Sequence, residues 1–349
     1  MLVLATGRFR VCKQILMMKR IGNLYDQIIS VENLQLADQR ARRGKLKSYG
    51  VQKHDKNRDE NILKLQEDLK NKTFRTSDYH VFTITEPKER EIHQLPYYPD
   101  RIVHHAVMNI MEPIWVSVLT QDTYSCIKGR GIHACAEKLK KQLKNDVPNT
   151  AYCLKIDVRK FYPSVDHDVL KSILRRKIKD SDALWLLYEI IDSAPGVPIG
   201  NYLSQFFANL YLAYFDHYVK EVLAVKYYYR YADDMVFLSA SKDELHVILV
   251  EVNHYLNENL NLSLKGNYQV FPVKKRGIDF VGYRFFHTHT LMRKSIKKNF
   301  CRKADEVSKL NLDEKQYKMA LCPWIGWAKH CDSRNLVKTI ILPQYHEAI

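Results

Sequence analysis

Two adjacent aspartates interrupt an aromatic and apolar stretch, YYYRYADDMVFL, at residues 227–238. Tyrosines precede Asp233 and Asp234 and apolar residues follow them, and both kinds of residue favour β-strands. The pattern predicts a hairpin with both carboxylates near its tip. Neighbouring anions repel each other, so a divalent cation such as magnesium, which prefers oxygen ligands, is the natural partner. The alternative is an ordinary aspartate-rich turn.

A third aspartate ends another candidate strand, in the sequence AYCLKIDVRKFYPSVDHD at residues 151–168. Apolar residues alternate with other residues up to Asp157, which is the pattern of a strand. Three carboxylates can share two metal ions that serve phosphoryl transfer. We therefore predict that Asp157, Asp233 and Asp234 are catalytic and bind two Mg²⁺ ions, for which Mn²⁺ can substitute. The backbone carbonyl of Val158 is a further candidate ligand.

The net charge of the 349-residue chain is +16, which predicts a polyanionic partner. Ribosomal and membrane-surface proteins share this signature, so the charge alone does not identify the partner. The 22 tyrosines, 13 phenylalanines and four tryptophans offer surfaces for base stacking, although most aromatic residues belong to protein cores. No apolar run approaches the roughly 20 residues that cross a bilayer, so we expect a soluble protein with no membrane partner.

The seven cysteines are scattered and form no Cys-x-x-Cys pair. This pattern argues against a structural zinc site and a secreted disulfide framework, and it favours the cytoplasm of a prokaryotic host. Residues 1–20 contain a short apolar segment that Arg8 and Arg10 interrupt, so we interpret them as an N-terminal extension rather than a signal peptide. Met17 or Met18 is a candidate natural start.

Helices and one hairpin are expected before residue 120. Charged helices are predicted over residues 21–75, and residues 100–119 show helical periodicity with a break at Pro113. Residues 79–95 show the alternating pattern of β-strands on both sides of a turn at Glu86-Pro87, which predicts a hairpin. Lys88 and Arg90 lie close to that turn, where they could meet a triphosphate.

Later segments add glycine-containing loops and a basic region. The loop at residues 196–200 has two glycines, which we attribute to close approach of the backbone to a base pair, and a buried helix follows it. An amphipathic helix is predicted over 242–260, a strand carrying Lys265 follows, and a hairpin is predicted over 276–285. Residues 293–303 contain no acidic residue, so we expect an unpaired electrostatic face before two helices.

Six motifs occur in a fixed order: PKERE, CIKGRGIHA, IDVRKFY, PIGNYLSQFFANLYL, YADD and GIDFVGYRF. As a set they resemble those of prokaryotic reverse transcriptases over roughly residues 20–345. The resemblance implies an α+β right-hand polymerase fold, with fingers, a palm that carries an antiparallel sheet, and a short helical thumb. The implied domains are an extension at 1–20, fingers at 21–150, the palm at 151–286 and the thumb at 287–349.

The patterns and the resemblance together assign two further groups of residues. The nucleotide-binding candidates are Lys88, Arg90, Phe161, Tyr162, Ile199, Gly200, Gln205 and Lys265. Among them, Tyr162 lies five positions after Asp157, where the family places the aromatic residue that closes against the sugar. The nucleic-acid-binding candidates are Arg130, Tyr231, Gly282, Arg293, Lys294, Lys297 and Lys298.

Within the family, the pocket loop is most similar to that of diversity-generating retroelement reverse transcriptases. Many relatives have Pro-Gln-Gly and Ser-Pro, whereas this chain has Pro198-Ile199-Gly200 and Ser204-Gln205. Isoleucine cannot make the hydrogen bonds of glutamine, so discrimination among nucleotides should weaken. The resemblance implies that the chain uses dNTPs to copy a template RNA and binds the RNA/cDNA duplex. It also implies that errors are concentrated at adenines and that the cDNA is transferred into a variable gene. The implied protein partner is a small basic oligomeric accessory protein.

Two alternatives remain open, and two other classes of reverse transcriptase fit the sequence less well. A group II intron protein would normally continue into a maturase region, and retron enzymes carry Asn-Ala-x-x-His and Val-Thr-Gly signatures that this sequence lacks. An antiphage reverse transcriptase is the main enzymatic alternative, because some of these proteins also diverge at the pocket loop. A non-catalytic RNA-binding protein on a polymerase fold is the second alternative, although such a protein has no reason to concentrate anions beside RNA.

Overall fold

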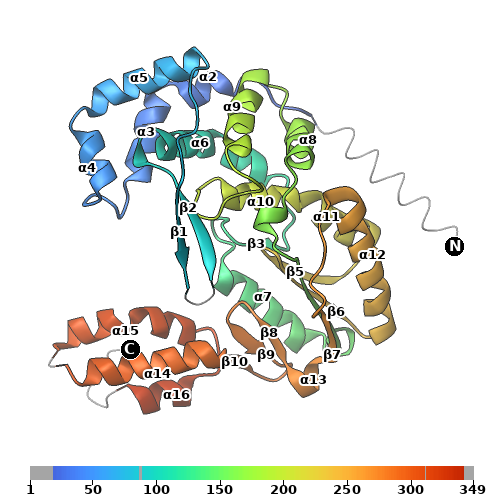
Figure 1. The fold of residues 1–349 in the computed structure, drawn as a ribbon. Coiled ribbons are helices and arrows are strands. Elements are labelled where there is room, and N and C mark those ends of the chain that lie inside the picture. Colours follow the sequence, from blue (N-terminus) through green and yellow to red (C-terminus); the bar gives the residue numbers. More distant parts are fainter. Residues whose placement is uncertain (1–18, 86–88, 311, 342–349) are drawn as a thin grey trace, which may run out of the picture. The chain divides into compact units, whose positions relative to one another are not determined.

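The computed structural model describes residues 19–85, 89–310 and 312–341 and shows a mixed α+β chain (Figure 1). The chain divides into two compact units, each assembled from separate segments. The first unit contains the described residues up to 121 together with segments 158–224 and 252–264. The second contains segments 122–157 and 225–251 and the described residues from 265 onward.

The first unit is mainly helical. Its N-terminal helices are α2 (Tyr25–Ile29), α3 (Val31–Ala41), α4 (Tyr49–Asp55), α5 (Arg58–Lys70) and, after the π-helical turn η1 (Tyr97–Arg101), α6 (Ile102–Val116). Its later helices are α8 (His167–Lys177), α9 (Ser181–Asp192), α10 (Ser204–Tyr211), α11 (Ala213–His217) and η4 (Tyr218–Val222). These elements confirm the predicted helices over 21–75 and the buried helix after residue 200.

The predicted break at Pro113 is wrong, because α6 continues through this residue to Val116. A proline lacks only its own N–H donor, and this one lies in the last turn of the helix. The helix therefore loses one hydrogen bond near its end rather than its continuity.

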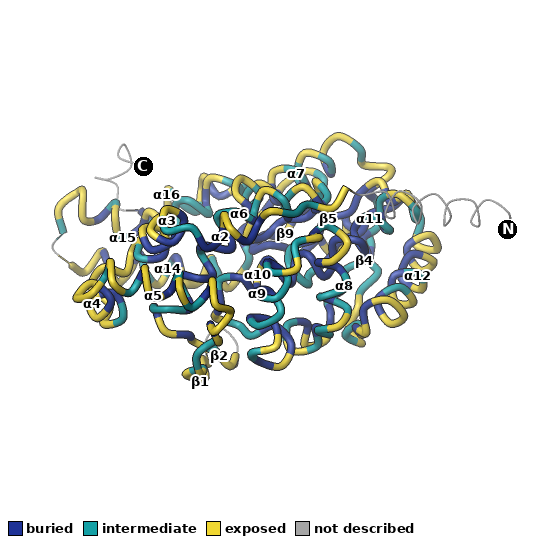
Figure 2. Tube along the Cα trace, turned by 90° about the horizontal axis from the view of Figure 1, so that it is seen from above, coloured by how far each residue is buried: buried dark blue, intermediate teal, exposed yellow. Residues whose placement is uncertain are grey.

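The predicted hairpin before α6 is present in the first unit. Strands β1 (His80–Ile84) and β2 (Arg90–Gln94) pair antiparallel, with Ile84 opposite Arg90. Every residue of β1 is exposed, as the colouring in Figure 2 shows. Residues 86–88, which include the predicted turn position and Lys88, lie outside the described residues.

A five-stranded sheet forms the centre of the second unit. Its strands are β3 (Thr123–Tyr124), β4 (Tyr152–Asp157), β5 (Tyr227–Tyr231), β6 (Asp234–Ser239) and β7 (Gln269–Pro272), in the order β3-β5-β6-β4-β7. Helix α7 (Ile132–Asn145) buries Cys135, Leu139 and Leu143 in the same apolar cluster as Tyr229 and Val236 of the sheet. The predicted strand before Asp157 is confirmed, and its last residue is the aspartate itself.

Helix α12 (Lys242–Leu260) runs from the second unit into the first. Its predicted inward residues Leu245, Ile248, Val252 and Leu256 are buried, which confirms the amphipathic pattern.

The rest of the second unit contains a small sheet and a helical bundle. After the short α13 (Val273–Arg276), strands β8 (Ile278–Phe280), β9 (Tyr283–Phe285) and β10 (Thr290–Met292) pair in the order β10-β9-β8. Helices α14 (Lys294–Ser308), α15 (Glu314–Ala328) and α16 (Arg334–Ile340) share their own apolar core. The hairpin over 276–285 is confirmed, but the structure has three C-terminal helices instead of the predicted two.

Within the described residues, no helix combines the length and apolar character that a membrane span requires.

Candidate active site

The aspartate pair lies at the tip of the hairpin formed by β5 and β6, as the sequence predicted. Tyr231 pairs with Asp234, so Ala232 and Asp233 form a two-residue loop between the strands. Ala232 has a φ of 53°, and a positive φ at the first loop position is typical of a type II′ turn. The buried Arg230 side chain donates a hydrogen bond from Nη1 to the Ala232 carbonyl at 3.1 Å and thereby supports this conformation.

The register of the central sheet brings the third carboxylate to the hairpin. Asp157 on β4 lies directly opposite Asp234 on β6, and side chains at paired positions lie on the same face of a sheet. Burial and the neighbouring Asp157 carboxylate raise the pKa of Asp233 to about 6. Burial likewise raises the pKa of Asp234 to about 6, although Lys155 acts in the opposite direction. The structure therefore brings the three predicted catalytic aspartates together.

Two lysines each contact one carboxylate oxygen of this cluster. Lys155 Nζ lies 3.1 Å from Asp234 Oδ2 and donates a hydrogen bond to the Asp279 carbonyl at 2.6 Å. Lys265 Nζ pairs with Asp157 Oδ2. Lys265 was expected on a strand, but it lies in the connection after the bridge residue Leu264, before β7. Its partner in the described residues is one of the predicted catalytic carboxylates.

The other oxygens of the same carboxylates remain available for a cation. Asp157 Oδ1 and Asp234 Oδ1 are buried and have no hydrogen-bond partner among the described residues. A buried anionic oxygen without a partner is costly, so these atoms fit divalent metal ions that prefer carboxylate ligands. The described part of the chain holds no ready-made group of three or more metal-ligating side chains, and in this arrangement Lys155 and Lys265 pair with Asp234 and Asp157.

A cavity of about 310 Å³ opens beside Asp157 in the second unit, and several cations line it. They are Lys155, Arg276, Arg284 and Arg293. Arg293 Nε donates to Asp279 Oδ1 at 2.6 Å, so it is paired.

The expectation of an unpaired basic face over residues 293–303 is wrong in part. Besides Arg293, both Arg302 and Lys303 pair with Glu306, at 3.9 and 3.5 Å. The acidic partners, Asp279 and Glu306, lie outside residues 293–303. The exposed lysines of α14 without a salt bridge among the described residues are Lys294, Lys297 and Lys298.

Several predicted nucleotide-binding residues lie in the first unit. Phe161 is buried and contacts the half-buried Tyr162 edge to face, with ring centroids 5.5 Å apart. Arg90 and Gln205 are exposed. Their roles in nucleotide binding stay predictions.

The pocket-loop glycines have protein neighbours that explain them. A Cβ atom at Gly200, whose φ is 123°, would lie 2.6 Å from the His93 carbonyl oxygen of β2. The carbonyl of Ile199 accepts a hydrogen bond from the His93 N–H at 2.8 Å. A Cβ at Gly196 would lie 2.6 Å from the Tyr162 carbonyl oxygen. Protein neighbours therefore account for the two glycines, and approach of this loop to a base pair stays a prediction.

The remaining candidates are placed as follows. Gly282 is buried in the turn between β8 and β9, where a Cβ atom would lie 2.3 Å from the Trp327 ring. This contact explains the glycine by packing of α15. Arg130 precedes α7, the half-buried Tyr231 ends β5, and Val158 is buried in a bridge with Leu264.

Sequence reasoning missed Lys155 and Arg230. Both could have been recognised in the sequence, because each is a cation among apolar and aromatic strand residues. Lys155 lies two residues before Asp157, and Arg230 lies two residues before Ala232. The period of two along a strand places Lys155 on the face of Asp157.

Comparisons with known proteins agree with this geometry. Residues 86–285, more than half of the chain, match the family described as reverse transcriptase (RNA-dependent DNA polymerase). Protein YkfC of Escherichia coli K12 is 27% identical over 235 residues, which cover 54% of this chain and 61% of YkfC. The group II intron-encoded protein LtrA of Lactococcus lactis is 23% identical over 177 residues, which cover 47% of this chain and 29% of LtrA. The chain thus spans less than two thirds of these relatives.

The fold has a counterpart among solved structures. Apo telomerase from Candida tropicalis superimposes with a TM-score of 0.50 at 10% identity, over 76% of this chain and 59% of that chain. At this identity the similarity concerns the fold alone, and it confirms the predicted α+β polymerase fold. Residues 86–285 match the domain of an RNA-directed DNA polymerase. This match over more than half of the chain places the chain in the reverse transcriptase (RNA-dependent DNA polymerase) family.

Proposed function

We propose that this chain copies RNA into DNA by adding dNTPs to a primer 3′ hydroxyl with two Mg²⁺ ions. The observation that carries the proposal is the cluster of Asp157, Asp233 and Asp234, with two buried oxygens that lack partners among the described residues. Lys155 and Lys265 hold the opposite oxygens of two of these carboxylates. Two bound metal ions would supply activation of the hydroxyl and stabilisation of the pyrophosphate leaving group.

Extension of a primed RNA template by the purified chain tests this proposal. We expect Mg²⁺-dependent product from the natural chain and none from Asp233→Asn/Asp234→Asn, because asparagine keeps the shape but removes the charge that binds the metal. A matched control is Asp59→Asn/Glu60→Gln, which removes two exposed acidic charges from α5 and should keep activity. Equal loss in both variants would contradict a specific role for the hairpin.

We further propose that the copying is error-prone and serves a diversity-generating retroelement in a bacterial cytoplasm, with a small basic accessory protein. The support is the pocket-loop sequence, in which Ile199 replaces the glutamine of many relatives and Ser204-Gln205 follows. An aliphatic side chain leaves the nucleotide with fewer polar constraints, so wrong nucleotides are rejected less strongly.

Sequencing of the cDNA tests the finer proposal. We expect errors concentrated at template adenines, and fewer of them in Ile199→Gln, which restores a hydrogen-bonding side chain. Leu291→Gln introduces glutamine at an exposed apolar position of β10 and should leave the error spectrum unchanged. Accurate product from the natural chain would favour an antiphage or other prokaryotic reverse transcriptase. Tight RNA binding without product, even with cognate RNA and accessory protein, would favour a non-catalytic RNA-binding protein.

A further inference from the structure

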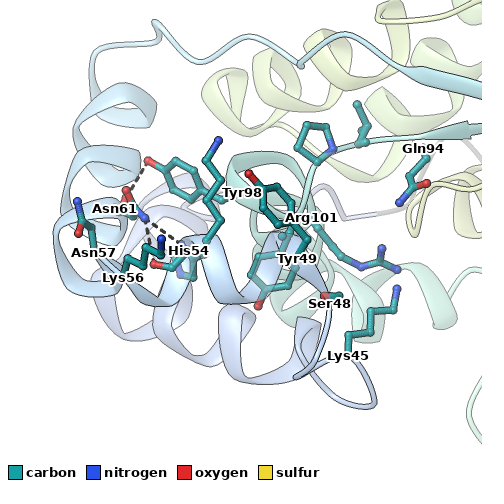
Figure 3. Close-up of a pocket in the computed structure, with 15 residues that line it drawn as sticks. Lys45, Ser48, Tyr49, His54, Lys56, Asn57, Asn61, Gln94, Tyr98 and Arg101 are labelled. Carbon is teal, nitrogen blue, oxygen red and sulfur yellow. Dashed lines mark hydrogen bonds between the residues drawn. The ribbon is translucent and has the colours of Figure 1, made fainter.

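A cavity of about 1140 Å³ lies in the first unit, among the helices that precede the hairpin β1–β2 (Figure 3). Its walls come from the loop after α3, from α4, from the beginning of α5 and from residues 94–101. The wall segments within residues 45–61 precede the range that matches the reverse transcriptase family. The function proposed above does not use this cavity.

The cavity is cationic. Lys45, Lys53, Lys56 and Arg101 line it, and no aspartate or glutamate does. Within the described ranges none of the four forms a salt bridge, and Arg101 Nε is buried without a hydrogen-bond partner. Burial lowers the pKa of Arg101, and burial together with the charge of Arg101 lowers that of Lys45. In Figure 3 these two side chains extend next to each other, so an anion between them would relieve an unfavourable pair.

Aromatic side chains accompany the cations. Tyr49, the first residue of α4, is 78% exposed. Tyr98 stacks on His54 with ring centroids 5.3 Å apart, and burial lowers the pKa of His54, which keeps the imidazole neutral. An exposed aromatic ring beside unpaired cations is the combination that binds single-stranded nucleic acid, where bases stack and phosphates are neutralised.

The walls are fixed by buried interactions. Asp38 of α3 is fully buried and accepts hydrogen bonds from Arg42 at 2.7 Å, Arg58 at 2.7 Å and the Tyr97 hydroxyl at 2.5 Å. Gly50 of α4 packs so closely on η1 that a Cβ atom would lie 2.8 Å from Tyr97 Cβ. The cavity is therefore formed without a ligand, which limits the ordering cost of binding.

We propose that this cavity binds a single-stranded segment of RNA, with the four cations on its phosphates and Tyr49 stacked on a base. The choice of RNA rests on the proposed function, because a chain that copies RNA must retain parts of that RNA that are not in the duplex. Binding here needs no primer, nucleotide or metal, so it can be measured separately from polymerisation.

Lysine footprinting on the full chain tests the site directly. The probe is a short unstructured RNA without primer or Mg²⁺, and the readout is lysine acetylation by mass spectrometry. We expect protection of Lys45, Lys53 and Lys56, and none of Lys64 and Lys70, which are exposed on α5 outside the cavity. The same protection should persist in Asp233→Asn/Asp234→Asn, so failure of catalysis and failure of this site are distinguishable.

Affinity measurements supply the matched comparison. Lys53→Gln/Lys56→Gln should lower the slope of log K against log salt by about 1.4, because two phosphate contacts to a single strand are lost. Lys64→Gln/Lys70→Gln removes the same amount of charge from α5, outside the cavity, and should leave the slope unchanged. Tyr49→Ala should weaken binding by roughly 5- to 100-fold at an unchanged slope.

Three outcomes would overturn the proposal. Equal slopes for the two double-lysine variants would mean that only overall charge matters. Unchanged affinity in Tyr49→Ala would remove the stacked base. Equal protection of the cavity lysines by inorganic tripolyphosphate and by RNA at the same phosphate concentration would make the cavity a site for free polyphosphate.

Discussion

Lys155 lies where it can determine which oxygen of Asp234 faces a metal ion. Its Nζ contacts Oδ2 and the Asp279 carbonyl, while Asp234 Oδ1 is buried without a hydrogen-bond partner in the described residues. Groups that hold a metal ligand in place commonly contribute 10- to 100-fold to metal affinity or activity. We therefore expect Lys155 to act through Asp234 rather than on the substrate.

We expect Lys155→Met to raise the Mg²⁺ concentration at half-maximal rate by about 10-fold. Methionine keeps the length of the side chain but removes the donor that holds Oδ2. The measurement is a Mg²⁺ titration of primer extension, accompanied by Mn²⁺ binding to the free chain followed by electron paramagnetic resonance. Lys138→Met breaks the pair with Asp122 on the same unit and should leave both unchanged. A lower Mg²⁺ requirement in Lys155→Met would show that the lysine competes with the metal instead.

At the scale of elements, one carboxylate joins the first-unit helices. Asp38 of α3 accepts hydrogen bonds from Arg42 in the turn after the same helix, from Arg58 of α5 and from Tyr97 of η1. The buried His54 of α4 lies 3.5 Å from the same carboxylate. Burial acts to raise the pKa of Asp38, but the hydrogen bonds outweigh it and lower the pKa.

Asp38→Asn should reduce the free energy of unfolding by about 3 kcal/mol at neutral pH, because it removes the buried charge that pairs with Arg58 and Arg42, and Arg42 keeps only its exposed partner Asp55. Asp55→Asn is the control, since it removes the exposed partner of the same Arg42 and should cost less than about 1 kcal/mol. Urea unfolding of both variants measures the difference.

The same pair of variants predicts a pH dependence. A carboxyl whose pKa is lower in the folded state stabilises the fold above its unfolded pKa of about 4 and loses this effect as the pH falls further. The gap in stability between the natural chain and Asp38→Asn should therefore shrink below about pH 4. A gap that is constant with pH would mean that the ionised carboxylate is not the source of the stability.

On the scale of the whole molecule, local pattern was sufficient for most elements and for the positions of the three aspartates. Alternation and turn chemistry placed Asp157 at a strand end and Asp233 at a hairpin tip, because both features depend on neighbours in the sequence. The lysines that pair with these aspartates could not be predicted from local pattern. Lys155 contacts Asp234, which lies far along the chain, and Lys265 lies beyond α12. The reasons for Gly200 and Gly282 were also tertiary, namely His93 of β2 and Trp327 of α15.

The strand order of the central sheet also sets an order of assembly. β4 is flanked by β6 and β7, which follow it by dozens of residues, and the chain passes between the two units at residues 121, 157, 224, 251 and 264. During synthesis at about 5–20 residues per second, β4 waits several seconds or longer for its second neighbour. The carboxylate of Asp157 meets those of the hairpin only after most of the chain has left the ribosome. Nascent fragments that end before residue 269 therefore carry the motifs up to YADD without a completed central sheet.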